Sequence, residues 1–136
     1  MATSLLSCSK NNDNNVTPSS TNKVEQVSGN WTVSYYLDSG KDETSDYSGY
    51  QFVFATDGSL TASGLPGTFT GTWWIGSKGS DDDQSSNRLN IMISGNKAMD
   101  HLQHDWVILK LSDAEIWLKD DNSSSMEEIH FVSTNQ

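Results

Sequence analysis

The chain has 136 residues, 34% of them hydrophobic, and a formal net charge of −10. An acidic surface of this kind repels phosphate backbones, which disfavours nucleic acid as a partner. The sequence has no run of 18 apolar residues that would cross a membrane as a helix. Abundant Ser, Thr, Asn and Gly, with only two prolines and five tryptophans, indicate short strands joined by polar turns around an aromatic-rich core.

The first feature along the chain is Cys8, the single cysteine, in the run Leu5-Leu6-Ser7-Cys8-Ser9-Lys10. This run resembles the lipobox of bacterial lipoproteins, and a polar stretch follows it. We therefore expect Cys8 to carry a lipid, and residues 1–27 to form a truncated signal and a flexible polar linker. The alternative is an incidental cysteine on a frayed end. Residues 28–136 are predicted to form one domain.

From Gly29 onward, apolar residues recur at every second position, which is typical of half-buried strands. The dipeptide Asp57-Gly58 predicts a type I′ hairpin turn, and residues 95–103 have room for one helical turn. The strand around residues 106–111 lacks clean alternation and is predicted to be covered on both faces. The predicted strands cover approximately residues 30–37, 50–54, 59–63, 68–75, 88–94, 106–111, 115–119 and 128–132.

Eight strands with short sequential connections favour an antiparallel meander, because neighbours in sequence tend to pair in space. Such a meander closes on itself and so removes its exposed edges. The predicted fold class is all-β, a single eight-stranded antiparallel up-and-down barrel.

Several segments resemble the lipocalin-like lipoproteins common in Bacteroidetes. They are Gly29-Asn30-Trp31, Tyr50 to Phe54 followed by Asp57-Gly58, Gly71-Thr72-Trp73, and the C-terminal runs 115–119 and 129–131. The resemblance covers about residues 28–133. It implies a lipocalin-like barrel in which Trp31 plugs the closed end. It also implies a lipid-anchored binding protein for a small apolar or amphipathic ligand, at the outer membrane or cell surface.

Side chains predicted to point inward form the candidate ligand site, where burial of apolar surface would supply the affinity. The alternative is a packed core, because a barrel of this size can fill itself with its own side chains. The candidate ligand-binding residues are Trp31, Tyr35, Phe52, Phe54, Phe69, Trp73 and Ile91.

Three large aromatic residues, Tyr36, Trp74 and Trp117, fall on the opposite phase and are predicted to point outward. Exposed aromatic side chains often mark a recognition surface, so a second hypothesis is a module that binds a glycan or a protein partner. The alternative is that loops cover these rings.

The pair His101 and His104 has a spacing that suits a metal, but no third ligand follows at a fixed distance. We expect two solvated loop histidines and no metal site. The run Asp81-Asp82-Asp83 lacks the order of an EF-hand and is predicted to be a solvated acidic loop. No nucleophile elbow, phosphate loop or dinucleotide fingerprint is present, so we expect no catalytic residues and no cofactor.

Overall fold

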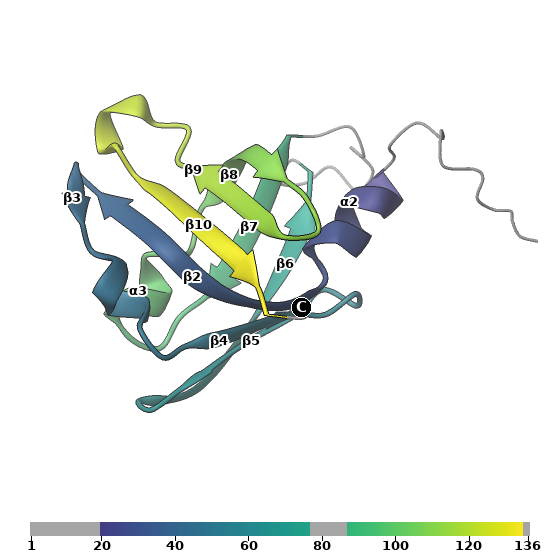
Figure 1. The fold of residues 1–136 in the computed structure, drawn as a ribbon, viewed down its shortest axis with the longest axis horizontal. Coiled ribbons are helices and arrows are strands. Elements are labelled where there is room, and N and C mark those ends of the chain that lie inside the picture. The colour runs from purple at the N-terminus through teal and green to yellow at the C-terminus, as the bar shows by residue number, and fades with distance from the viewer. Residues whose placement is uncertain (1–19, 77–86, 135–136) are drawn as a thin grey trace, which may run out of the picture.

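Eight antiparallel strands close into a barrel in the computed structural model, which describes residues 20–76 and 87–134 (Figure 1). Each barrel strand pairs with the next along the chain, and β10 pairs with β2 to close the sheet. The short strand β3 (Lys41–Asp42) extends β2 as a hairpin outside the barrel. The barrel strands are β2 (Gly29–Asp38), β4 (Gln51–Phe54), β5 (Ser59–Gly64), β6 (Gly67–Ile75), β7 (Arg88–Ile93), β8 (Asp105–Leu111), β9 (Glu115–Lys119) and β10 (Glu128–Ser133).

The closed barrel confirms the predicted fold class and the order of its strands. Along most strands, buried side chains alternate with more exposed ones. β4 buries Phe52 and Phe54 and β9 buries Ile116 and Leu118, while the residues between them are more exposed. Rings from neighbouring strands meet inside this wall, so the core lies in the barrel interior.

The turn after β4 differs from the predicted type I′ geometry. Gly58 has a φ of +95°, whereas Asp57 has no positive φ. The Gly58 N–H donates to the Ala55 carbonyl at 3.0 Å, and the Ala55 N–H donates to the Ser59 carbonyl at 2.9 Å. This is the hairpin loop in which a glycine with positive φ follows a tight turn.

The pairing of β8 with β9 explains why the sequence of β8 shows no clean alternation. Ile108 pairs with Leu118 and Lys110 pairs with Trp117, so Leu109 is an additional residue at a β-bulge. Leu109 is 46% exposed. The prediction that this strand is covered on both faces is therefore wrong at Leu109.

The segment expected to end the flexible linker is helical in the structure. Residues Ser20–Val27 form helix α2, and Val27 is fully buried while Val24 packs against the core. The Trp31 indole N–H donates to the Val27 carbonyl at 2.7 Å. Packing against Trp31 thus holds a polar sequence that has little apolar periodicity of its own.

Two short helical segments lie at the other end of the barrel from α2 (Figure 1). They are the 3-10 turn η2 (Thr44–Tyr47) and helix α3 (Lys97–Asp100), the latter within the predicted helical turn. A further 3-10 turn, η3 (Ser123–Ser125), precedes β10. Within the described ranges, no helix has the length and apolar character needed to span a bilayer.

Candidate functional site

The predicted ligand-binding residues mostly form a tightly packed aromatic core. Trp31, Phe52, Phe54, Trp73 and Ile91 are at most 3% exposed. Phe54 meets Trp73 edge to face with ring centroids 5.7 Å apart, and Phe131 lies between Phe52 and Phe54 at 5.5 and 5.8 Å. Such edge-to-face contacts stabilise the interior beyond the burial of apolar area alone.

Phe69 and the indoles of Trp31 and Trp73 are also fixed in place. The Trp73 N–H donates to the Ala55 carbonyl at 2.9 Å, as Trp31 does to Val27. Phe69 is partly exposed, and its ring lies over Gly95, where an added Cβ would fall 2.3 Å from the ring. The aromatic side chains predicted to bind a ligand therefore pack against other residues of the protein itself.

A β-bulge in β2 changes which of its side chains face inward. Val33 pairs with Phe131 and Tyr35 pairs with His130, so Ser34 is an additional residue opposite β10. After the bulge Tyr36 is 1% exposed, while the Tyr35 ring lies 4.8 Å from His130. The predictions that Tyr35 faces the ligand site and that Tyr36 faces outward are both wrong, because the bulge reverses the alternation.

The inward turn of Tyr36 completes a polar cluster at the α3 end of the barrel. The Tyr36 hydroxyl donates to Glu127 Oε2 at 2.6 Å, and its oxygen lies 3.1 Å from His101 Nδ1. His104 Nε2 lies 3.1 Å from Glu127 Oε1. The Glu127 side chain is only 6% exposed, so these contacts surround a buried carboxylate.

Both histidines are positioned by α3 and the start of β8. Asn96 caps α3 by accepting the Met99 N–H at 2.9 Å, and Met99 and Leu102 are fully buried beneath it. The prediction of two solvated loop histidines is wrong, since each is 33% exposed at its side chain and lies against Glu127.

The electrostatics of the cluster favour the charged forms of Glu127 and His104. Burial acts to raise the pKa of Glu127, but hydrogen bonds from His104 and Tyr36 outweigh it and leave the pKa below its usual value. The hydrogen bond to Glu127 raises the pKa of His104 against the opposing effect of burial. Burial, followed by the hydrogen bond to Glu127, raises the pKa of Tyr36, which remains a neutral donor.

Glu127 was not among the sequence-predicted candidates, although a signal for it exists. It lies two residues before Ile129 and four before Phe131, both of which are fully buried. The inward phase of the last strand therefore extends back to Glu127, and an acidic residue on a buried phase is uncommon without a partner.

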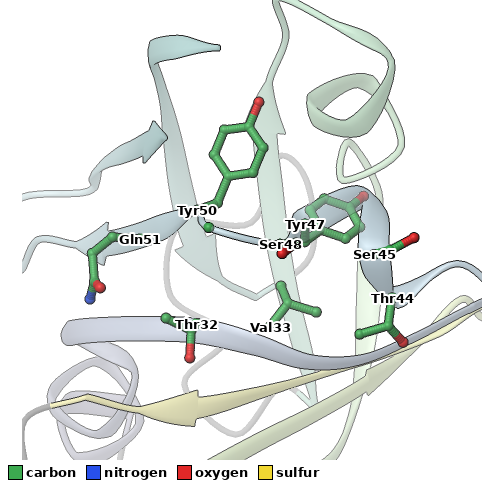
Figure 2. Close-up of a pocket in the computed structure, with 9 residues that line it drawn as sticks. Thr32, Val33, Thr44, Ser45, Tyr47, Ser48, Tyr50 and Gln51 are labelled. Atoms are coloured by element: carbon green, nitrogen blue, oxygen red, sulfur yellow. The ribbon is translucent and has the colours of Figure 1, made fainter. Parts of the chain in front are cut away.

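A pocket of about 620 Å³ opens in the barrel wall (Figure 2). It lies near the polar cluster, because the ring of its lining residue Tyr47 packs edge to face on Tyr36 with centroids 5.0 Å apart. The strands β2 and β4 pair only from Gly29 to Trp31, although β2 continues to Asp38. Beyond that point η2 lies beside β2, where the Glu43 N–H donates to the Tyr36 carbonyl at 2.8 Å. The pocket occupies the gap that the diverging strands leave.

The lining of this pocket is amphipathic. In Figure 2, Val33 rises from β2 toward Tyr47, and the Tyr50 ring stands nearby. Hydroxyl and amide groups surround this apolar centre. They belong to Thr32, Thr44, Ser45, Ser48 and Gln51.

The outer aromatic residues do not form one surface. Trp117 stacks on His130 with centroids 4.2 Å apart and an interplanar angle of 5°, and Lys110 Nζ lies 4.7 Å from the centre of its ring. Trp74 instead lines a separate pocket of about 490 Å³ beside β7. Cys8 and the predicted acidic loop lie outside the described residues.

Comparison with known proteins identifies the fold. No protein-family model and no curated protein matches the sequence. A DUF4847 family protein from Bacteroides vulgatus ATCC 8482 has a similar solved structure, with a TM-score of 0.58 and 17% sequence identity over 83% of this chain and 99% of that chain. At this identity the likeness is one of fold alone.

Proposed function

We propose that this protein is an extracytoplasmic binding barrel for a small, neutral or cationic amphipathic ligand, and that the pocket between β2 and η2 holds it. The observation that carries the proposal is the pocket itself, whose volume of about 620 Å³ lies in the usual range for small-molecule sites. No chemical step is part of this function.

The lining of the pocket suggests the ligand class. Val33 and the few exposed atoms of the buried Tyr47 and Tyr50 offer apolar contact, while the surrounding hydroxyls and the Gln51 amide offer hydrogen bonds. The net charge of −10 disfavours an anionic head group. A neutral amphiphile with a short apolar chain fits this combination better than the fully apolar ligand expected for the barrel interior.

A substitution at the rim tests the pocket directly. Ser45 is exposed on η2, so Ser45→Trp should place an indole in the pocket without disturbing the core. Titration calorimetry with a short-chain alkyl glucoside, kept below its micelle concentration, should show binding to the unmodified chain and a loss of at least about tenfold in the variant.

Thr70→Trp is the matched control, since Thr70 is exposed on β6 and does not line this pocket. It should bind the glucoside as the unmodified chain does. Equal affinity for all three proteins, or no heat from any of them, would rule the pocket out as the binding site.

Cys8 is the proposed anchor that keeps the barrel at the outer membrane or cell surface. The support is the lipobox-like run around the single cysteine. Intact-mass analysis of the protein from its native membrane should show added lipid mass, and Cys8→Ser should release the protein into the soluble fraction. A variant that stays with the membrane would contradict the anchor.

A second candidate function is recognition of a glycan through the outer stack of Trp117, His130 and Tyr35. The Trp117 indole stacks flat on His130 at 4.2 Å, and the cation of Lys110 lies over the ring at 4.7 Å, so the indole is held in one orientation. On a glycan array, Trp117→Ala should abolish any signal and Trp74→Ala should retain it, because Trp74 lies elsewhere. Unchanged binding by Trp117→Ala excludes this surface.

A further inference from the structure

Three potential metal ligands from segments far apart in the sequence lie close together at one end of the barrel. Asp38 ends β2, His101 follows α3, and Glu127 precedes β10. His101 Nδ1 lies 3.5 Å from Asp38 Oδ2 and 3.8 Å from Glu127 Oε2. All three ligand atoms lie within 4.8 Å of one another.

These separations suit a small divalent ion. Ligand atoms bound tetrahedrally to zinc at its usual nitrogen and oxygen distances are about 3.4 Å apart. The distances from His101 to Asp38 and Glu127 are close to this value, and the two carboxylate oxygens lie within 4.8 Å of each other, so small side-chain rotations suffice to close the triad on an ion. Imidazole nitrogen together with carboxylate oxygen is a donor set typical of zinc and related transition metals.

The surrounding residues orient the two carboxylates. His104 contacts Glu127 Oε1, and the Tyr36 hydroxyl donates to Glu127 Oε2. The Ser39 hydroxyl donates to Asp38 Oδ1 at 3.2 Å, and Asp38 Oδ2 is the oxygen nearest His101. Residues that support ligands in this way are a regular feature of metal sites.

Charge and exposure also favour a cation. Two carboxylates lie beside the His101 imidazole. His104 pairs with the almost completely buried Glu127, and Asp38 adds a second negative charge that a bound cation would balance. The Asp38 and His101 side chains are 30% and 33% exposed, so the site is reachable from solvent on one side. The net charge of −10 raises the local concentration of cations.

We propose that Asp38, His101 and Glu127 form a binding site for one divalent ion of the zinc class, with a further coordination position facing solvent. His104 and Tyr36 are positioning residues that hold the Glu127 carboxylate. The ion links β2, α3 and β10, so its binding stabilises this end of the barrel. The site is separate from the pocket between β2 and η2, and it does not depend on what that pocket binds.

The test uses the full chain with Cys8→Ser, which removes the one thiol that would compete for zinc. After treatment with EDTA and its removal, cobalt titration should give one ion per chain with visible bands of a low-coordinate nitrogen and oxygen site. Zinc titration should show a matching stoichiometry and a higher unfolding midpoint.

His101→Gln tests a ligand, and His130→Gln is the matched control on the outer face. His101→Gln should weaken zinc binding by more than the roughly 10–100-fold that loss of a supporting residue costs, and His104→Gln should stay within that range. His130→Gln should bind zinc like the parent chain. Near-ultraviolet circular dichroism verifies that each variant is folded.

Three results would overturn the proposal. They are the absence of zinc binding by the folded parent chain, unchanged affinity in His101→Gln, or equal loss in His130→Gln. Retention of the ion by His101→Gln with its loss from both His104→Gln and Asp120→Asn would place the ion in the neighbouring triad of His104, Asp120 and Glu127 instead.

Discussion

Ser34 determines which side chains of β2 reach the polar cluster. Because it is the extra residue of a bulge, strict alternation from Trp31 ends at Val33 and resumes one position later. Tyr36 then lies inside the barrel and Asp38 lies beside His101. The bulge at Ser34 therefore has two effects. It makes a prediction from strict alternation wrong, and it brings Tyr36 and Asp38 to the polar cluster.

Phenylalanine substitutions at the two adjacent tyrosines distinguish these orientations. Tyr36→Phe removes the hydrogen bond to the buried Glu127 carboxylate and should lower the free energy of unfolding by about 1–3 kcal/mol. Tyr35→Phe, whose ring packs on His130 at the surface, should change it by less than about 0.5 kcal/mol. Urea unfolding of both variants measures the difference, and a larger effect at Tyr35 would contradict the bulge.

At the scale of elements, the two helices cover opposite ends of the barrel, and each end is secured in the same way. Helix α2 covers the Trp31 end through buried Val27, whereas α3 and the turn after it cover the other end through buried Met99 and Leu102. The Trp106 indole N–H donates to the Leu102 carbonyl at 2.9 Å, which ties the segment after α3 to β8. In both cases an inward tryptophan donates its indole N–H to a backbone carbonyl, at the last residue of α2 or in the turn after α3.

Truncation tests whether α2 belongs to the folded unit. A chain that starts at residue 28 loses the buried Val27 side chain and the acceptor for Trp31, so its free energy of unfolding should fall by about 2–4 kcal/mol. A chain that starts at residue 20 is the control and should match the full chain in urea unfolding. Equal stability of the two truncated chains would show that residues 20–27 are a linker.

At the scale of the whole molecule, closure of the barrel and its net charge have opposite effects on the stability of the folded state. Pairing of β10 with both β9 and β2 leaves no open edge among the eight barrel strands. Eighteen acidic residues against eight basic ones give a surface that repels itself in the compact state. The barrel therefore folds against a long-range repulsion that salt screens.

Raising the sodium chloride concentration from about 0.01 to 0.2 M should increase Tm by about a few degrees, because the Debye length shortens. Asp113→Lys, at an exposed turn, should raise Tm at low salt and reduce the increment that salt adds. Differential scanning calorimetry measures both effects. A Tm that falls with salt would mean that attractive ion pairs outweigh the net repulsion.

The sequence by itself determined the strand positions, the barrel and most of the inner rings, because alternation is a local property that follows from the backbone of a strand. It also determined the acidic surface, since net charge depends on composition alone. Phe52, Phe54 and Trp73 are buried where the pattern places them.

Only the tertiary structure decided which side chains of β2 face inward beyond Ser34. It also decided that Ser20–Val27 is a helix and that Asp38, His101 and Glu127 lie together. A bulge is defined by its pairing with another strand, and α2 is held by a tryptophan that lies in the barrel. A cluster drawn from positions 38, 101 and 127 has no local spacing to reveal it. These features depend on contacts between distant segments, which come together only when the barrel closes.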